Sequence, residues 1–134
     1  MEVNDTIVLD TNAIISLFDG NQDIANMLGE ENTVILPAIV CGEFEAGAQG
    51  KTRRGNAAMT AFNGLLSLSP VSVLPATRRT GRHYAQLFAA LKRAGTPIPT
   101  NDIWIAASTI ECGGVLITND RHLLSIPQLR TITY

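Results

Sequence analysis

The chain has 134 residues, a formal net charge of −2 at pH 7, and 46% hydrophobic and 16% charged residues. These values are typical of one globular domain with a buried core. No apolar stretch approaches the roughly 20 residues of a membrane span, so a membrane protein is not expected. The acidic start is also unlike a signal peptide. We therefore expect one domain, residues 1–134, in the cytoplasm and away from membranes.

Apolar runs alternate with amphipathic segments along the chain. In chain order, the pattern predicts a strand at 6–10, helices at 12–19 and 23–29, a strand at 33–36, helices at 37–47 and 52–68, a strand at 71–74, helices at 78–94 and 101–112, a strand at 115–118, a short helix at 121–124 and a strand at 129–133. This alternation predicts an α/β fold with helices on both faces of a mostly parallel sheet.

Charge is unevenly distributed along the sequence. Residues 1–50 carry nine acids and no Lys or Arg, whereas residues 51–100 carry eight Lys or Arg and no acid. One interpretation is a polyanionic partner for the basic part of the surface. The other is that the two segments neutralise each other across the fold.

Four carboxylates occupy positions where an acid with a purely structural role is costly. Asp10 and Asp120 follow two apolar runs, and sites in open sheets form beyond the carboxyl ends of strands. Glu43 and Asp102 fall on the apolar faces of their predicted helices. Ionised carboxylates in such places repel one another unless a cation joins them, and Mg²⁺ or Mn²⁺ prefers carboxylate and water oxygens.

Helical wheels separate these acids from their neighbours, because successive residues are about 100° apart. Asp102 groups with apolar residues, whereas Glu111 falls on the opposite side. Glu43 points inward and Glu45 outward. Structural alternatives remain: Asp102 caps its helix, Glu43 pairs with an Arg of the basic segment, and Asp10 and Asp120 act as simple helix caps.

Hydroxyl and amide side chains accompany the acids. Thr11 and Asn12 follow Asp10, and Thr118 lies two residues before Asp120. These three side chains are expected to hydrogen-bond the metal ligands or bound water.

The motifs resemble those of PIN-domain nucleases, in particular the VapC-like toxins of bacterial and archaeal toxin–antitoxin pairs. The matching segments are 8–12 (Val-Leu-Asp-Thr-Asn), 39–44 with Glu43, 101–107 with Asp102, and 117–122 (Ile-Thr-Asn-Asp-Arg-His). The resemblance covers essentially the whole chain. It implies a single PIN-like nuclease domain with a three-layer α/β/α arrangement around a five-stranded parallel sheet, and Mg²⁺- or Mn²⁺-dependent endoribonuclease activity. It also implies a homodimer and inhibition by a cognate antitoxin protein.

By this resemblance, Asp10, Glu43, Asp102 and Asp120 form the catalytic quartet. Asp10 is expected to be the central metal ligand because a strand end is rigid, and Asp102 and Asp120 to complete the coordination. Glu43 would bind a second metal ion or orient the attacking water. The implied reaction is metal-assisted hydrolysis of the RNA phosphodiester bond.

Six basic residues are candidates for gripping the RNA backbone. They are Lys51, Arg53, Arg54, Arg78, Arg79 and Arg82. A solvated face explains each cluster equally well, and an acidic antitoxin tail is a third possible partner.

The remaining reactive or aromatic side chains are assigned structural roles. Cys41 and Cys112 are expected to be small core residues. His83 is expected at the surface, and His122 to pack or cap. Trp104 is expected to pack in the core, with a dimer or antitoxin contact as the alternative.

Two other functions remain open. A catalytically silent PIN-like module would bind RNA or a partner without cutting, although it would have no need of four buried acids. A haloacid-dehalogenase-like phosphatase also places an Asp after its first strand. That chemistry requires a second Asp where this chain has Asn12, and a later Lys for which Lys92 is the candidate.

Overall fold

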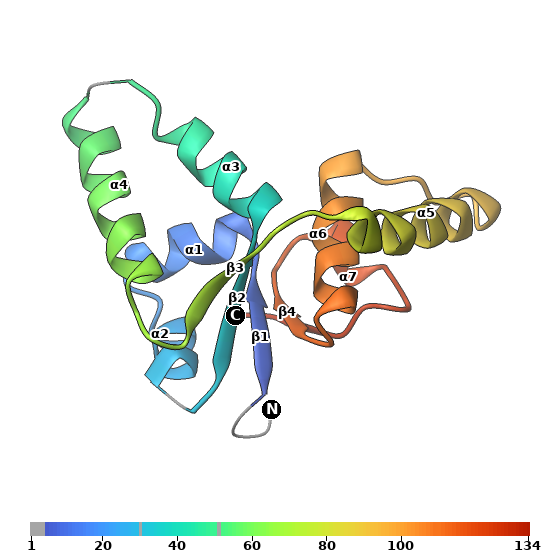
Figure 1. Cartoon of the computed structure of the whole chain (residues 1–134), viewed down its shortest axis with the longest axis horizontal. Helices are drawn as coiled ribbons and strands as arrows, with labels where there is room; N and C mark the ends of the chain where they lie inside the picture. Colours follow the sequence, from blue (N-terminus) through green and yellow to red (C-terminus); the bar gives the residue numbers. More distant parts are fainter. Residues whose placement is uncertain (1–4, 30, 51) are drawn as a thin grey trace.

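The computed structural model describes residues 5–29, 31–50 and 52–134. Figure 1 shows a central sheet seen nearly edge-on, with α1 and α2 on one side and α5, α6 and α7 on the other. This arrangement confirms the predicted α/β fold with helices on both faces of the sheet.

Five parallel strands form the sheet, in the order β3-β2-β1-β4-β5. They are β1 (Thr6–Leu9), β2 (Thr33–Pro37), β3 (Val71–Leu74), β4 (Val115–Ile117) and β5 (Thr131–Ile132). The three-residue run Ile7 to Leu9 and the whole of β4 are fully or almost fully buried. Burial on both faces is characteristic of a parallel sheet covered by helices, and explains why these runs are continuously apolar.

Seven helices are present in the described ranges. They are α1 (Thr11–Phe18), α2 (Gln22–Gly29), α3 (Ala38–Gly47), α4 (Arg53–Leu66), α5 (Arg78–Arg93), α6 (Thr100–Glu111) and α7 (Arg121–Leu124). No helix in these ranges is long and apolar enough to cross a membrane.

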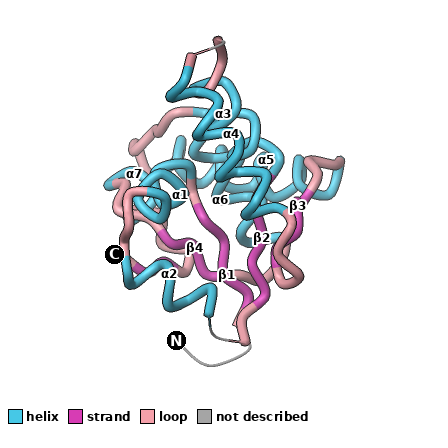
Figure 2. The backbone as a smooth tube through the Cα atoms, turned by 90° about the vertical axis from the view of Figure 1, so that its left-hand side faces the viewer, coloured by secondary structure: helices cyan, strands magenta, loops and turns pink. Residues whose placement is uncertain are grey.

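Most predicted boundaries agree with the structure to within one or two residues. The last strand is shorter at both ends than the predicted 129–133, because it is confined to Thr131–Ile132. Pro37 also lies differently from the prediction, because it ends β2 and forms the N-cap of α3 instead of its first turn. Neither difference alters the order of the elements along the chain. Figure 2 shows β4, β1, β2 and β3 side by side in the sheet.

A pair of glycines sets the position of β4. Gly113 adopts a positive φ of 68° directly after α6, which residues with a side chain rarely do. At Gly114 an added Cβ would lie 2.9 Å from Val8 Cγ2 and 3.2 Å from the carbonyl oxygen of Thr6. The absence of side chains here lets β4 lie directly against β1.

Candidate functional site

The register of β1 and β4 joins the first two residues of the site. Leu9 pairs with Ile117, so the next residues, Asp10 and Thr118, meet where the strands end. Thr118 Oγ1 donates a hydrogen bond to Asp10 Oδ2, while the other oxygen, Oδ1, accepts from the backbone N–H of Ala13 at 2.7 Å. Asp10 is 4% exposed and is also the N-cap of α1. Its carboxylate is therefore held rigidly from two directions.

Thr118 also connects Asp10 to Asp120. The Thr118 hydroxyl accepts a hydrogen bond from the backbone N–H of Asp120 at 3.0 Å while it donates to Asp10. Asp120 is the N-cap of α7, and its Oδ1 accepts from the backbone N–H of His122 at 2.8 Å. One buried hydroxyl thus fixes the relative position of two carboxylates from different segments.

Glu43 reaches the site from α3. Its Oε1 accepts a hydrogen bond from Thr11 Oγ1 at 2.8 Å, and its Oε2 accepts from Asn101 Nδ2 at 3.3 Å. Glu43 is partly buried, whereas Glu45 is exposed, as the helical wheel predicts. The hydrogen bonds of Glu43 come from a hydroxyl and an amide, so the alternative of a pairing with an arginine finds no support among the ion pairs of the described residues.

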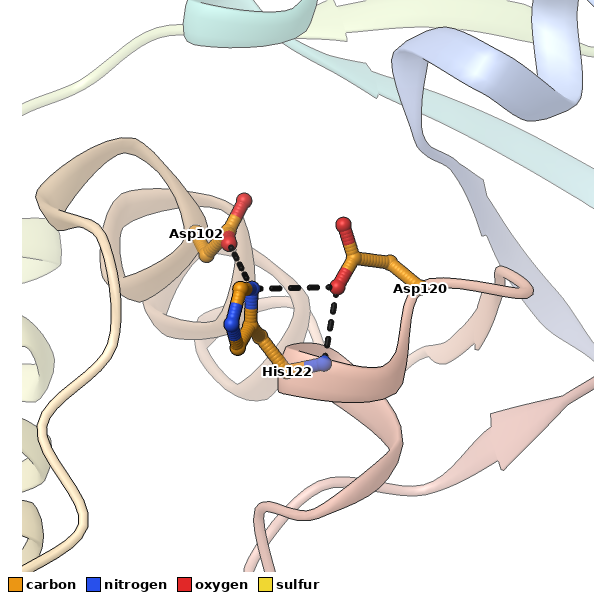
Figure 3. Close-up of side chains that lie close together, drawn as sticks. All are labelled: Asp102, Asp120 and His122. Carbon is orange, nitrogen blue, oxygen red and sulfur yellow. Dashed lines mark hydrogen bonds and ion pairs between the residues drawn. The ribbon is translucent and has the colours of Figure 1, made fainter.

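Asp102 comes from the first turn of α6, whose N-cap is Pro99. Its side chain is 16% exposed and Oδ2 lies 3.6 Å from His122 Nδ1. The same nitrogen is 3.5 Å from Asp120 Oδ1. Figure 3 shows the imidazole ring of His122 between the two carboxylates. The three side chains offer ligand atoms that all lie within 4.8 Å of one another.

The nearby negative charges raise the pKa of two of the four acids. Burial raises the pKa of Asp10 above its ordinary 3.8, the hydrogen bonds from Thr118 and Ala13 oppose this, and the charges of Asp120 and Glu43 raise it further. Burial also raises the pKa of Asp102, as does the charge of Asp120, while His122 lowers it. The negative charges of the other acids therefore make the carboxyl groups of Asp10 and Asp102 harder to ionise.

This donor set fits a divalent cation. The carboxylates of Asp102 and Asp120 come within 4.8 Å of each other, and Asp10 and Glu43 lie near enough for their charges to raise the pKa of Asp102. A hard cation would relieve this repulsion. The four acids predicted from the sequence are thus brought to one edge of the sheet. Thr11 and Thr118 lie with them as hydrogen-bond donors to Glu43 and Asp10. Asn12 is exposed in the first turn of α1, and its predicted hydrogen bond to a metal ligand or bound water stays a prediction.

The predicted RNA-binding residues lie outside this cluster. Arg53 and Arg54 are exposed at the start of α4, and Arg78, Arg79 and Arg82 are exposed at the start of α5. Lys51 lies outside the described residues. Among the described residues, no ion pair joins the acidic first segment to the basic middle one, so mutual neutralisation finds no support.

Arg54 and Glu43 both line a groove between α1, α3 and α4. It has a volume of 480 Å³, and its apolar lining includes Ile15, Phe18, Phe44 and Ala58. Gly47 of α3 also lines this groove and is exposed. The apolar face of α3 borders an open groove instead of the core along this stretch.

Two residues near the acids were not predicted to take part in the site. His122 was expected only to pack or cap, and Asn101 was given no role. The contact of His122 with Asp120 could have been predicted from the sequence, because a residue two positions after a helix-capping acid lies next to that acid. The contact of Asn101 with Glu43 could not have been predicted, because it joins two helices that are distant in sequence.

The other side chains have structural surroundings. Trp104 stacks on Tyr84 of α5 with ring centroids 4.3 Å apart, so it packs within the chain. Cys41 is buried and Cys112 partly buried, and both are free thiols. Burial raises the pKa of both thiols, which disfavours the thiolate form. His83, expected at the surface, is partly buried on α5.

Comparison with known proteins places this fold and site in a family. The model of the PIN domain matches residues 7–129. Ribonuclease VapC1 of Haemophilus influenzae strain R2866 is 30% identical over 117 residues, covering 84% of this chain and 85% of the relative. The chain therefore belongs to the PIN-domain family. This membership excludes the haloacid-dehalogenase alternative.

Solved structures agree with this assignment. VapBC-1 from nontypeable Haemophilus influenzae superposes with a TM-score of 0.80 at 28% identity, covering 96% of this chain and 97% of the other. DNA-bound VapBC from Salmonella typhimurium gives a TM-score of 0.79 at 26% identity, with coverages of 96% and 98%. The similarity thus extends over nearly the whole length of both chains.

Proposed function

We propose that this protein is a metal-dependent endoribonuclease of the VapC type, acting as the toxin of a toxin–antitoxin pair. The observation that carries the proposal is the convergence of Asp10, Glu43, Asp102 and Asp120 at the carboxyl edge of the sheet, with Asp10 fixed by Thr118. The similarity to Ribonuclease VapC1 supports ribonuclease activity. A silent binding module is less consistent with the site, because burial and neighbouring negative charges raise the pKa of Asp10 and Asp102, which costs stability unless a cation binds.

In the proposed mechanism each acid has a distinct task. A bound Mg²⁺ or Mn²⁺ would supply an activated water and neutralise charge that gathers on the phosphate. Asp10, Asp102 and Asp120 would hold this ion, with Asp10 the least mobile because both of its oxygens accept hydrogen bonds. Glu43, directed by Thr11 and Asn101, would orient the water for attack opposite the leaving oxygen.

The substrate proposed is RNA, held in part by arginines. Arg54 is the strongest candidate, since it lines the same groove as Glu43. Arg53, Arg78, Arg79 and Arg82 are exposed and free to contact phosphates further along the strand. Lys51 stays in this proposal on its charge alone.

The partner proposed is a cognate antitoxin. Support comes from the solved relatives, which include VapBC assemblies and a member of the VapBC family of toxin–antitoxin systems. A homodimer, a single nuclease domain spanning residues 1–134 and a cytoplasmic location remain predictions. Sedimentation of the purified protein tests the first of these directly.

The decisive experiment measures cleavage of a fluorescent RNA by the purified chain. We expect cleavage with added Mg²⁺ or Mn²⁺, none with a chelator, and a loss of at least about 100-fold in Asp10→Asn without a drop in melting temperature. Asp23→Asn, which changes an exposed acid in the first turn of α2 away from the groove, is the matched control and should cleave normally. Cleavage that survives chelation, or full activity in Asp10→Asn, would contradict the mechanism. RNA binding without cleavage would favour the silent module.

A further inference from the structure

His122 is positioned as a member of the site and not merely as its neighbour. Its Nδ1 lies 3.5 Å from Asp120 Oδ1 and 3.6 Å from Asp102 Oδ2, between carboxylates of two different elements (Figure 3). Both separations exceed the 2.7–3.2 Å of a nitrogen–oxygen hydrogen bond. The nitrogen therefore faces two carboxylate oxygens without being committed to a strong bond with either.

Burial does not force the ring into this place. The His122 side chain is 39% exposed, so rotation toward solvent would be open to it. The backbone holds the residue near the acids, because its N–H donates to Asp120 Oδ1 at 2.8 Å and the next residue, Leu123, is anchored in the core. The short helix α7 thus presents the histidine to the same space that Asp102 and Asp120 face.

Nitrogen and oxygen donors select different metals. Mg²⁺ is a hard cation that takes oxygen ligands almost exclusively, whereas imidazole nitrogen binds first-row transition ions well. A site made of carboxylates alone discriminates little between Mg²⁺ and Mn²⁺. One imidazole nitrogen added to the same carboxylates favours the transition ion.

We propose that His122 Nδ1 is a ligand of the divalent ion held by Asp102 and Asp120, and that it makes this site prefer transition ions such as Mn²⁺ and Co²⁺ over Mg²⁺. The proposal rests on the metal-dependent function proposed above and adds a residue and a selectivity to it. An alternative reading is that a protonated His122 takes the place of the cation. The two readings predict opposite effects of removing the ring, since a ligand strengthens metal binding and a competing charge weakens it.

The test is metal binding, measured by titration calorimetry with Mg²⁺, Mn²⁺ and Co²⁺ and without RNA. For His122→Phe, which keeps a ring but no donor nitrogen, we expect the affinity for Mn²⁺ and Co²⁺ to fall at least about tenfold, with a much smaller change for Mg²⁺. His83→Phe is the matched control, because His83 is the only other histidine of the chain. An unchanged Mn²⁺ to Mg²⁺ preference, or tighter binding of both ions, would overturn the proposal.

A spectroscopic measurement on the unmodified protein avoids any dependence on how the variant folds. Electron spin-echo spectra of bound Mn²⁺ should contain a coupling to histidine nitrogen, which His83→Phe retains and His122→Phe loses. Absence of this coupling from the wild-type protein would overturn the proposal.

Asp102→Asn distinguishes an error in the role of His122 from an error in the proposed metal-dependent function. If Mn²⁺ binds and needs Asp102 but shows no nitrogen coupling, only the role of His122 is wrong, whereas a wild-type chain that neither binds metal nor cuts RNA contradicts the proposed function as well.

Discussion

The two ends of α6 hold acids in opposite circumstances. In the first turn, Asp102 faces Asp120 and feels Glu43 and Asp10, so its pKa is raised by burial and by like charges. In the last turn, Glu111 accepts a hydrogen bond from Thr80 Oγ1 at 2.5 Å. Glu111 thus has a hydrogen-bond donor within the protein, whereas Asp102 lies among other negative charges. An acid whose surroundings oppose its charge indicates a site for a cation, and an acid whose surroundings satisfy it indicates a structural role.

The surroundings of Glu111 show what a structural polar contact requires. Thr80 is fully buried on α5, where its hydroxyl donates to Glu111 and accepts from the backbone N–H of Thr77 at 3.0 Å. This arrangement caps α5 and ties its start to the end of α6. Tyr84 and Trp104 stack a little further along the same contact. The polar groups of this region are therefore paired, and its stability needs nothing from outside the chain.

Variants at the two ends of α6 should differ most in their rate of RNA cleavage. Asp102→Asn removes a proposed metal ligand and is expected to lower RNA cleavage by at least about 100-fold. Glu111→Gln, on the same helix, should cleave RNA at close to the wild-type rate per folded molecule. Rates measured on one fluorescent substrate at saturating Mn²⁺ test the pair. Equal losses in both variants would mean that α6 acts only through its stability.

A smaller catalytic effect is expected when the support of Asp10 is removed. Thr118→Val deletes the hydroxyl that donates to Asp10 and accepts from Asp120, so the two carboxylates lose their common anchor. We expect cleavage to fall about 10- to 100-fold, the range for loss of a hydrogen bond to a metal ligand. Thr109→Val is the control, because Thr109 is equally buried but donates only to the carbonyl oxygen of Ile105 within α6. A Thr118→Val enzyme as active as the control would show that the bridge has no catalytic role.

At the other end of α6 the expected effect is on stability. Thr80→Val leaves both Glu111 and the Thr77 N–H without their partner, which should cost about 1–3 kcal/mol of unfolding free energy. Denaturant titration measures this cost. Thr60→Val, whose exposed hydroxyl bonds only within α4, should cost almost nothing. Metal affinity should be the same in both variants, and a loss of affinity in Thr80→Val would mean that the two ends of α6 are coupled.

The smallest effect concerns pH. The folded-state pKa of Asp102 is raised above 3.8, so the native protein binds this proton more readily than the unfolded chain does. Its charge therefore costs stability above the raised pKa, and the cost disappears as the pH falls toward 3.8. Metal-free Asp102→Asn should melt at a higher temperature than wild type at neutral pH, and the difference between the two melting temperatures should narrow on acidification. Melting curves at several pH values in chelator test this, and a constant or inverted gap would contradict it.

The helices, the strands and the positions of the four acids could be predicted from the sequence because they depend on local patterns. Continuous apolar runs define β1 and β4, and the helical wheel distinguishes Glu43 from Glu45 within a single turn. The place of His122 beside Asp102 could not be predicted in this way. It depends on where α7 lies relative to α6, and residues that are neighbours in the sequence do not encode that distance.

The sequence by itself determined the alternation of strands and helices, and which carboxylates stand at strand ends or on inward helix faces. Only the tertiary structure decided that Thr118 bridges Asp10 and Asp120, that Asn101 reaches Glu43, and that His122 enters the site. The physical reason is the range of the interactions. Periodicity and helix capping act over a few residues, whereas the meeting of side chains from β1, α3, α6 and α7 depends on strand register and helix contacts set by the whole core.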